Sequence, residues 1–290
     1  MFVPGFYDIA PRDAHETMER PFFSISKNPR FEPIMYESDD KRVFVVVSGG
    51  KPDGIATIWD KDILIWAVSQ IREAIDRGEE PSQTIFFHPY QLLKAVRRPI
   101  GGEHYKRLKR AMTRLTNTTI KTSIRADKKT MEKGFHWLDD YTTAEDNQTG
   151  EAAGMWSITL SRWMYQAALN QARVLTLDDD YFLLTGGLER WLYLIARKHG
   201  GRQQNGWRLT MRVLYEKSGS TRLYKLFAQD IRKIVQEDEL PGYHLEIWRG
   251  ADGIEQLHFN RRSNLAFSHP AYQPDLPRNI KKMSGELSTV

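Results

Sequence analysis

The feature that most constrains the fold is an order of predicted elements that occurs twice in the 290-residue chain. Each copy begins with a short, apolar-lined helix, passes through a glycine turn into a longer helix with a basic stripe, and leads into a pair of strands. This is the order of elements in a DNA-reading winged helix, so the sequence predicts an α+β fold of two tandem winged-helix (helix-turn-helix plus β-wing) domains. The helices are predicted at 89–96 and 103–117 around Gly101-Gly102, and at 210–217 and 220–236 around Ser218-Gly219.

Positive charge is concentrated in the same two regions. Residues 94–129 hold twelve Lys or Arg against two acids, and residues 190–233 hold eleven against two. These regions are net +10 and +9 in a chain of net charge +5, so the remainder is net −14. A clustered basic surface favours DNA binding, because neutralising phosphates releases condensed counterions. One basic stripe alone would more simply be a solvated helix face, but two stripes in a repeated motif favour DNA.

The two longer helices each have an apolar face and a basic face. Arginine and glutamine can pair bidentately with guanine and adenine in the major groove, and lysine can bind phosphates. A shift of 115 residues places Arg107, Arg110 and Arg114 on Arg222, Lys225 and Gln229. The residues predicted to face the core are Tyr105, Leu108, Met112 and Leu115 in the first helix and Leu223, Phe227, Ile231 and Ile234 in the second.

Each domain is also predicted to carry a wing. Strands at 118–125 and 134–138 would hold a basic tip between them, and strands at 243–249 and 254–260 would form the second wing. Two recognition helices could enter successive major grooves ~34 Å apart, which predicts a long, bipartite DNA site. The candidate DNA-binding residues are Lys106, Arg107, Lys109, Arg110, Arg114, Asn117, Lys128, Lys129, Lys133, Ser218, Ser220, Thr221, Arg222, Lys225, Gln229, Arg232 and Lys233.

The remaining segments complete the predicted organisation. We expect a hairpin of strands 42–48 and 55–59, a helix from Asp60 to about Arg77, and a polar loop at 139–154. The best domain boundary is at 170–173. The predicted divisions are an N-terminal arm at 1–38, a first winged-helix domain at 39–172, a second at 173–267, and a flexible C-terminal tail at 268–290.

Composition excludes several classes of protein. The longest apolar runs are too short to span a bilayer, and no basic segment followed by an apolar segment opens the chain, so we expect a cytoplasmic protein without membrane partners. The chain contains no cysteine, which excludes disulfides, thiolate zinc sites and cysteine nucleophiles.

A search for catalytic chemistry finds little. The eight histidines are scattered and predicted to be structural, and Gly49-Gly50-Lys51 lacks the remainder of a phosphate-binding loop. The acidic run Asp178-Asp179-Asp180 is better explained as a helix cap than as a metal site. We therefore expect a protein that is not an enzyme and binds neither cofactor nor metal.

Several longer phrases resemble one known family. They are Glu19 to Lys27 (ERPFFSISK), Gly54 to Ile65 (GIATIWDKDILI), Leu188 to His199 (LERWLYLIARKH), the segment Leu175 to Phe182, and Lys217 to Thr221 (KSGST). In this order they resemble the replication initiator protein A family of plasmid-type initiators, from Arg20 to about Arg262.

The resemblance implies two winged helices that bind repeats at a replication origin, help to melt nearby DNA, and recruit host helicase and initiator proteins. It also implies a monomer on the repeats and a dimer that represses its own promoter. Residue by residue, only the second turn and helix, Ser218 to Arg232, carry over.

The sequence leaves two alternative functions and one mode of assembly open. A transcriptional repressor would share the DNA-binding surface but recruit no replication proteins. A nicking nuclease would use Asp178 to Asp180. For assembly, the arm 1–38 and the hairpin 42–59 offer an edge and an aromatic surface for a homodimer.

Overall fold

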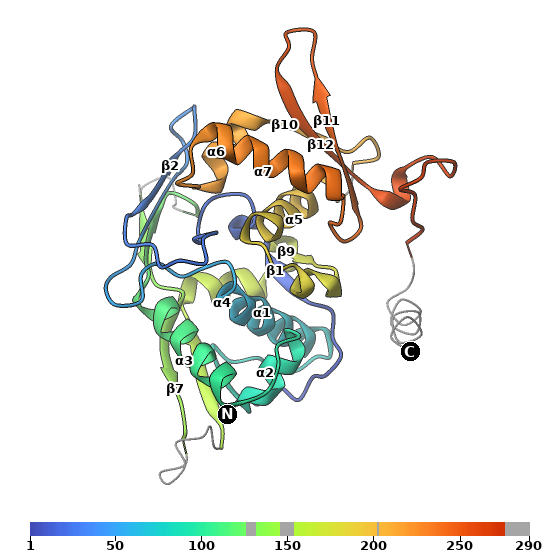
Figure 1. Ribbon diagram of the computed structural model, residues 1–290. Coiled ribbons are helices and arrows are strands. Elements are labelled where there is room, and N and C mark those ends of the chain that lie inside the picture. The colour runs from blue at the N-terminus through green and yellow to red at the C-terminus, as the bar shows by residue number, and fades with distance from the viewer. Residues whose placement is uncertain (126–131, 146–153, 202, 276–290) are drawn as a thin grey trace.

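A computed structural model describes residues 1–125, 132–145, 154–201 and 203–275 (Figure 1). Helices and antiparallel sheets are mixed along the chain, so the α+β class is confirmed. In Figure 1, α6, α7 and β10 to β12 (residues 207–261) lie at one end of the molecule, and α2 and α3 (residues 89–117) and β7 (residues 138–142) lie at the other. No helix in the described ranges is long and apolar enough to cross a membrane.

The first repeat has the order helix, strand, helix, helix, strand, strand. Its sheet is antiparallel and has the order β4-β8-β7, so the last strand lies between the other two. The helices agree with the sequence predictions within one or two residues, because their apolar periodicity is local. The elements are α1 (Lys61–Asp76), β4 (Thr84–Phe87), α2 (Pro89–Ala95), α3 (Gly102–Asn117), β7 (Leu138–Thr142) and β8 (Trp156–Leu160).

The second repeat has the same order and the same strand connectivity. Its three-stranded sheet has the order β10-β12-β11, again with the last strand in the middle. Gly219 ends the first motif helix in the left-handed conformation, at φ 61°, as the predicted glycine turn requires. The elements are α5 (Gly187–Gly200), β10 (Trp207–Thr210), α6 (Met211–Ser218), α7 (Tyr224–Glu237), β11 (Tyr243–Arg249) and β12 (Glu255–Arg261).

A separate four-stranded sheet corrects two sequence predictions. Its order is β2-β3-β5-β6. The predicted wing strands of the first domain do pair with each other. They belong to this sheet, however, and not to the sheet β4-β8-β7 of the first repeat. The hairpin predicted for 42–59 is wrong, because β3 pairs with β2 and β5 while 55–59 contains no strand. The strands are β2 (Ile34–Glu37), β3 (Phe44–Ser48), β5 (Thr119–Thr122) and β6 (Lys133–Phe135).

The polar segment at 139–154 was also predicted wrongly in part. Its first residues form β7, which pairs with β8, and residues 146–153 lie outside the described ranges. The hairpin that accompanies α3 is therefore β7–β8, as in the second repeat, where β11–β12 accompanies α7. The alternation of polar and apolar residues in β7 is interrupted by a register shift between Leu138 and Asp140.

The N-terminal arm starts beside β4 of the first repeat, where Phe2 bridges to Ile85, and then runs between the two repeats. Its strand β1 (Arg12–Ala14) pairs with β9 (Val174–Thr176), directly after the predicted boundary at 170–173 (Figure 1). Phe22 and Phe23 of the arm are buried, and Phe23 stacks on Trp137 with ring centroids 4.6 Å apart. A short helix, α4 (Arg162–Leu169), with Ser161 as its N-cap, packs against β1 and α1.

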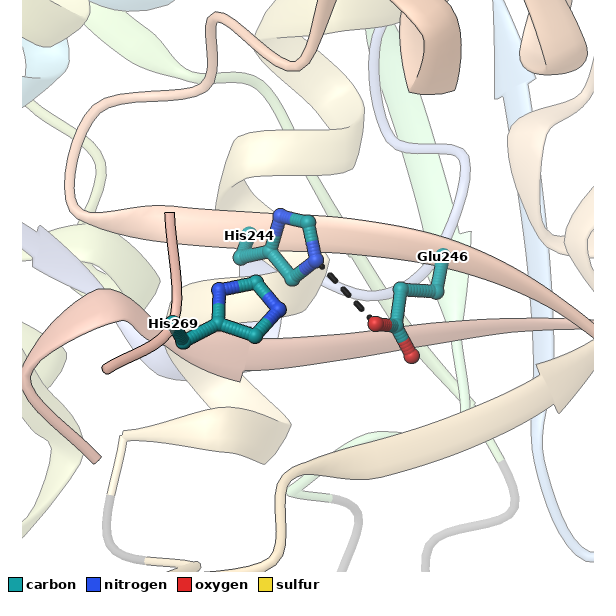
Figure 2. A group of neighbouring side chains, drawn as sticks. All are labelled: His244, Glu246 and His269. Atoms are coloured by element: carbon teal, nitrogen blue, oxygen red, sulfur yellow. Dashed lines mark hydrogen bonds and ion pairs between the residues drawn. The ribbon is translucent and has the colours of Figure 1, made fainter. Parts of the chain in front are cut away.

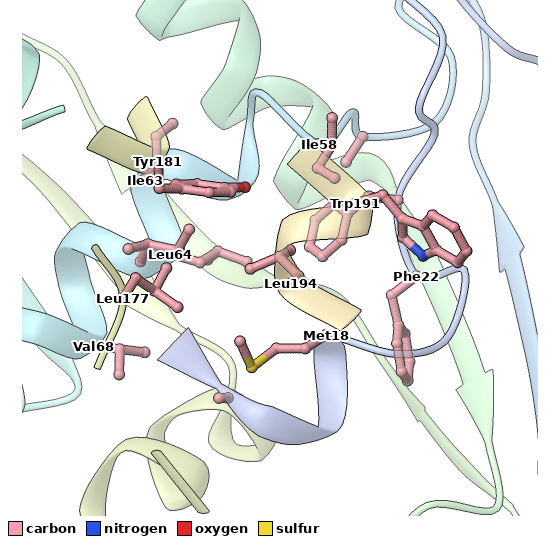
Figure 3. Packing of buried hydrophobic residues seen from close by; sticks show 14 of the residues in the cluster. Met18, Phe22, Ile58, Ile63, Leu64, Val68, Leu177, Tyr181, Trp191 and Leu194 are labelled. Carbon is pink, nitrogen blue, oxygen red and sulfur yellow. The ribbon is translucent and has the colours of Figure 1, made fainter. Parts of the chain in front are cut away.

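The buried apolar residues form one continuous cluster across both repeats. Figure 3 shows Met18 of the arm, Leu64 of α1 and Leu194 of α5 packed together with Leu177 and Tyr181. Inside this region the guanidinium of Arg190 on α5 binds Asp62 on α1 at 2.7 Å, and both side chains are buried. The two repeats therefore share a core, and the division into separate domains stays a prediction.

Candidate nucleic-acid interface

The basic face of α3 is narrower than the sequence predicted. Leu108, Ala111, Met112 and Leu115 are buried as expected from their spacing, and Tyr105 is half-buried. On the opposite side the exposed residues are Lys106, Arg107, Arg110 and Asn117. Arg107 is 3.3 Å from Glu103 one turn earlier, an exposed pair that weakly restrains its side chain.

Arg114 does not belong to this exposed face. Two nitrogens of its guanidinium donate to the carboxylate of Asp60, Nε to Oδ2 at 2.7 Å and Nη2 to Oδ1 at 2.6 Å. The hydrogen bonds to the buried Asp60 raise the pKa of Arg114 above its ordinary value, although burial opposes this. Arg114 therefore fixes the start of α1 to α3, and its prediction as a groove-reading residue is not supported by its position. Lys109 is likewise paired, at 2.6 Å, with Glu145.

The hairpin beside α3 is acidic. Thr113 of α3 and Tyr141 of β7 share a hydrogen bond of 2.8 Å, which holds the hairpin against the helix. Asp139, Asp140 and Glu145 are exposed on this hairpin and the segment that follows it. Lys133, predicted for a basic wing tip, lies on β6 of the other sheet, and Lys128 and Lys129 lie outside the described residues.

The exposed face of α7 lies opposite a buried face of Phe227, Ala228, Ile231 and Ile234. Leu223, predicted to face the core, is 74% exposed, because the helix begins only at Tyr224 and Leu223 is its N-cap. The exposed candidates here are Thr221, Arg222, Lys225, Gln229, Arg232 and Lys233.

Ion pairs distinguish these candidates. Arg222 binds Asp230 at 3.0 Å, Arg232 binds Glu255 of β12, and Lys233 is 3.7 Å from Glu237. Three exposed basic residues on the two helices have no carboxylate within ion-pair distance in the described ranges. A phosphate would therefore meet no competing anion at these positions. These three residues are Lys106, Arg110 and Lys225.

The turn between α6 and α7 is covered by the N-terminal arm. Ser218 is buried; its Oγ donates to the carbonyl of Tyr215 and accepts from the N–H of Ser220. Arg30 of the arm donates to the carbonyl of Gly219. Ser218 therefore holds the turn and does not face solvent, contrary to the prediction, while Ser220 is half-buried and accepts from the N–H of Arg222.

Burial also corrects the register between the two helices. A shift of 119 residues, not 115, places the buried Leu108, Met112 and Leu115 on the buried Phe227, Ile231 and Ile234. In this register Lys106 corresponds to Lys225 and Arg110 to Gln229. The shift of 115 placed Arg107 on Arg222 and Arg110 on Lys225, but it would place Leu115 on the half-exposed Asp230.

The hairpin beside α7 carries residues that sequence reasoning did not select. The guanidinium of Arg208 on β10 lies 3.4 Å from the ring centre of Trp248 on β11, and both residues are exposed. Arg249 follows with its side chain 72% exposed and paired with Glu255. An exposed tryptophan among arginines at the end of a strand was the available signal.

The acidic run at 178–180 behaves as a cap. Asp178 Oδ1 accepts from the N–H of Asp180 at the start of a 3₁₀ turn, and Asp180 is 3.5 Å from Arg97. Among the described residues, the three carboxylates do not form a metal-sized group. The single such group in those ranges lies elsewhere, on β11 and the segment after β12, where the sequence predicted no metal ligands.

Comparisons with known proteins agree on one family. The sequence model described as Replication initiator protein A matches residues 12–245 of this chain. The "Putative replication protein" of Wigglesworthia glossinidia brevipalpis is 33% identical over 238 residues, which cover 79% of this chain and 82% of that protein.

Two solved structures are similar in fold. Both are crystal structures of domains 2 and 3 of RctB, with TM-scores of 0.60 and 0.53 and sequence identities of 14% and 13%. Each covers 83% of this chain, and the matches span 94% and 96% of the solved chains.

Proposed function

The chain belongs to the replication initiator protein A family, and on this premise we propose that it is a sequence-specific DNA-binding initiator acting at repeats of a plasmid-type origin. The observation that carries the proposal is the pair of exposed, basic helix faces on α3 and α7. Each face is presented by the same arrangement of a preceding helix and a three-stranded sheet.

Each repeat is, in this proposal, a winged helix. The strand order, with the last strand between the first and second, and the placement of α3 and α7 after a short helix and a turn support this reading. The accompanying hairpins, β7–β8 and β11–β12, are then the wings. Because both repeats share one core, one molecule would bind a long, bipartite site.

The two repeats make different contacts in this proposal. Lys106 and Arg110 of α3 and Lys225 and Gln229 of α7 enter the grooves or bind the flanking phosphates. The β11–β12 hairpin adds a cationic and aromatic surface with Arg208, whereas the acidic β7–β8 hairpin is repelled by phosphates. The first repeat therefore depends on its helix alone.

The test measures fluorescence anisotropy of the protein on DNA flanking its own gene and on a scrambled duplex, over a salt series. Arg110→Ala and Gln229→Ala should each cost about 1 to 3 kcal/mol on the native DNA if these residues read bases. Lys225→Ala should weaken both duplexes alike and lower the salt slope by about 1 if it binds phosphate.

Arg162→Ala serves as the matched control, because Arg162 is an exposed basic residue at the start of α4, away from both stripes. The proposal fails if Arg110→Ala, Gln229→Ala and Lys225→Ala all bind both duplexes as tightly as the control does.

We also propose that the protein has no nuclease activity and acts by recruiting host helicase and initiator proteins. Incubation of supercoiled origin DNA with the protein and a divalent metal should leave the DNA intact. Cleavage that disappears in Asp180→Asn would contradict this. Capture of host helicase by the immobilised protein separates an initiator from a repressor that only occupies its promoter.

A further inference from the structure

Three side chains of the kind that bind transition metals converge beside the second hairpin. They are His244 and Glu246 of β11 and His269 of the segment that follows β12. One nitrogen or carboxylate oxygen from each lies within 4.8 Å of the others. Figure 2 shows the two imidazole rings side by side with the carboxylate next to them.

The fold accounts for this convergence. Residues two apart on a strand point to the same side of the sheet, so His244 and Glu246 share the outer face of β11, while Tyr243 and Leu245 are buried. The chain after β12 turns back past this face, and two turn hydrogen bonds hold His269 there. They are His269 N–H to Ala266 at 2.8 Å and Tyr272 N–H to the His269 carbonyl at 2.9 Å.

A fourth residue orients the first imidazole. His244 Nδ1 lies 2.7 Å from Asp238 Oδ2, which directs the other nitrogen, Nε2, to Glu246 at 3.2 Å. Asp238 is itself held, because its Oδ1 accepts from the N–H of Leu245 and Arg262 binds its other oxygen at 3.1 Å. A histidine bound to a metal usually donates its second N–H to a carboxylate in this way, which fixes the ring.

The carboxylate of Glu246 is also prepared to accept a cation. The indole N–H of Trp248 donates to its Oε2 at 3.0 Å. This hydrogen bond holds the carboxylate in place beside His244. His244, Glu246 and His269 line a groove of about 620 Å³ that is open to solvent.

We propose that His244, Glu246 and His269 bind one Zn²⁺ ion, which fastens the segment after β12 to the second hairpin. Two imidazoles and one carboxylate form a donor set that suits Zn²⁺, whereas Mg²⁺ and Ca²⁺ prefer oxygen donors alone. The cation takes the place of the contact between His244 Nε2 and Glu246, and water completes the fourth position.

Binding requires a small rearrangement at His269. Its Nδ1 accepts the N–H of Ala271 at 3.0 Å. A metal on Nδ1 would take the lone pair that accepts this hydrogen bond, and a metal on Nε2 would leave the ring proton on Nδ1, so either coordination breaks the hydrogen bond. Zinc would therefore change the conformation of the turn at 269–271, as well as tether it. This change in the turn can be measured without DNA.

The experiment is calorimetric titration of chelator-treated full-length protein with Zn²⁺, with Mg²⁺ as a comparison. We expect one Zn²⁺ per chain, no saturable Mg²⁺ binding at this site, and at least a tenfold weaker Zn²⁺ affinity in His244→Ala and in His269→Ala. His136→Ala is the matched control, because His136 is an exposed histidine on the connection between β6 and β7. It should bind Zn²⁺ like the wild type.

A second measurement guards against a misfolded variant. His269 lies on a segment outside the helices and sheets, so His269→Ala should keep the circular dichroism spectrum of the wild type. Zinc should slow amide hydrogen exchange across residues 265–275 in the wild type and not in His269→Ala. Equal Zn²⁺ affinity in the wild type and both variants, or exchange that zinc leaves unchanged, would overturn the proposal and leave a hydrogen-bonded cluster only.

Discussion

Arg110 and Arg114 are one helical turn apart on α3, and their surroundings assign them different roles. Arg110 is exposed without an ion-pair partner among the described residues, whereas Arg114 makes a bidentate pair with the buried Asp60. A bidentate pair that holds a buried carboxylate stabilises the fold, because removing the cation leaves that charge without its counterpart.

We therefore predict that one substitution affects stability and the other affects DNA binding. Arg114→Ala should lower the free energy of unfolding by about 2 kcal/mol, measured by urea denaturation. Arg110→Ala should leave the unfolding curve unchanged and weaken DNA binding. If both variants unfold at the same urea concentration as the wild type, the Asp60–Arg114 pair contributes nothing measurable.

Gly219 gives a second prediction at this scale. Its φ of 61° disfavours any residue with a Cβ, and a Cβ there would lie 2.7 Å from the Cβ of Pro21. Gly219→Ala should therefore cost at least ~1 kcal/mol in the free energy of unfolding. Gly253→Ala is the control, because Gly253 has φ 74° but no atom near its added Cβ. An equal loss in both would show that strain alone, without the arm, decides the cost.

Residues such as Arg114, Ser218 and Leu223 show what the sequence could not predict. Each was assigned from local spacing, but its exposure depends on a distant partner or on the residue at which the helix begins. Asp60 is 54 residues from Arg114, and the arm covers Ser218 from almost two hundred residues away. Candidates for DNA contact could be proposed from charge, while their accessibility could not.

At the scale of elements, helices were predictable and strand partners were not. A helix is determined by periodicity within its own residues, so α3 and α7 were placed correctly to within a few residues. The strand at 119–122 was also found, but β-branched residues do not specify a partner. It pairs with β3 and β6, and the true companion of α3 is the acidic hairpin β7–β8.

This acidic hairpin predicts an unusual effect of charge. The double substitution Asp139→Asn with Asp140→Asn should tighten binding to native and scrambled DNA alike, by a few fold at low salt, because it removes repulsion near α3. The gain should vanish at high salt. Glu79→Gln with Glu80→Gln changes the net charge equally on exposed residues between α1 and β4. If this control gives the same gain, total charge and not the hairpin is responsible.

At the scale of the whole molecule, an ion-paired glutamate ties the arm to the second repeat. Glu19 of the arm binds Lys198 of α5 at 2.6 Å and also binds Lys217 of α6. Burial raises the pKa of Glu19, but these two lysines outweigh it and lower the pKa below the ordinary value. No pattern along the sequence indicates this contact, because its members are 179 and 198 residues apart.

His199 lies beside this group and makes the junction sensitive to acid. Burial lowers the pKa of His199 to about 4 from its ordinary 6.5, although Glu19 opposes the shift. Between these two pH values the unfolded chain binds a proton at His199 that the folded chain does not, so stability falls as pH falls from 6.5 to 4. Lys198, Lys217 and Arg20 also face the ring and act in the same direction as burial.

We predict that lowering the pH from 7.5 to 5 reduces the free energy of unfolding, with His199 contributing on the order of 1 kcal/mol. His199→Gln cannot take up this proton and should show a smaller loss over the same interval. His136→Gln, at an exposed histidine, should lose as much as the wild type. The measurement is the urea midpoint of each variant at the two pH values. An equal loss of stability in His199→Gln would mean that protonation elsewhere destabilises the junction. A smaller loss would show that the half-buried imidazole of His199 makes the contact between the arm and the second repeat dependent on pH.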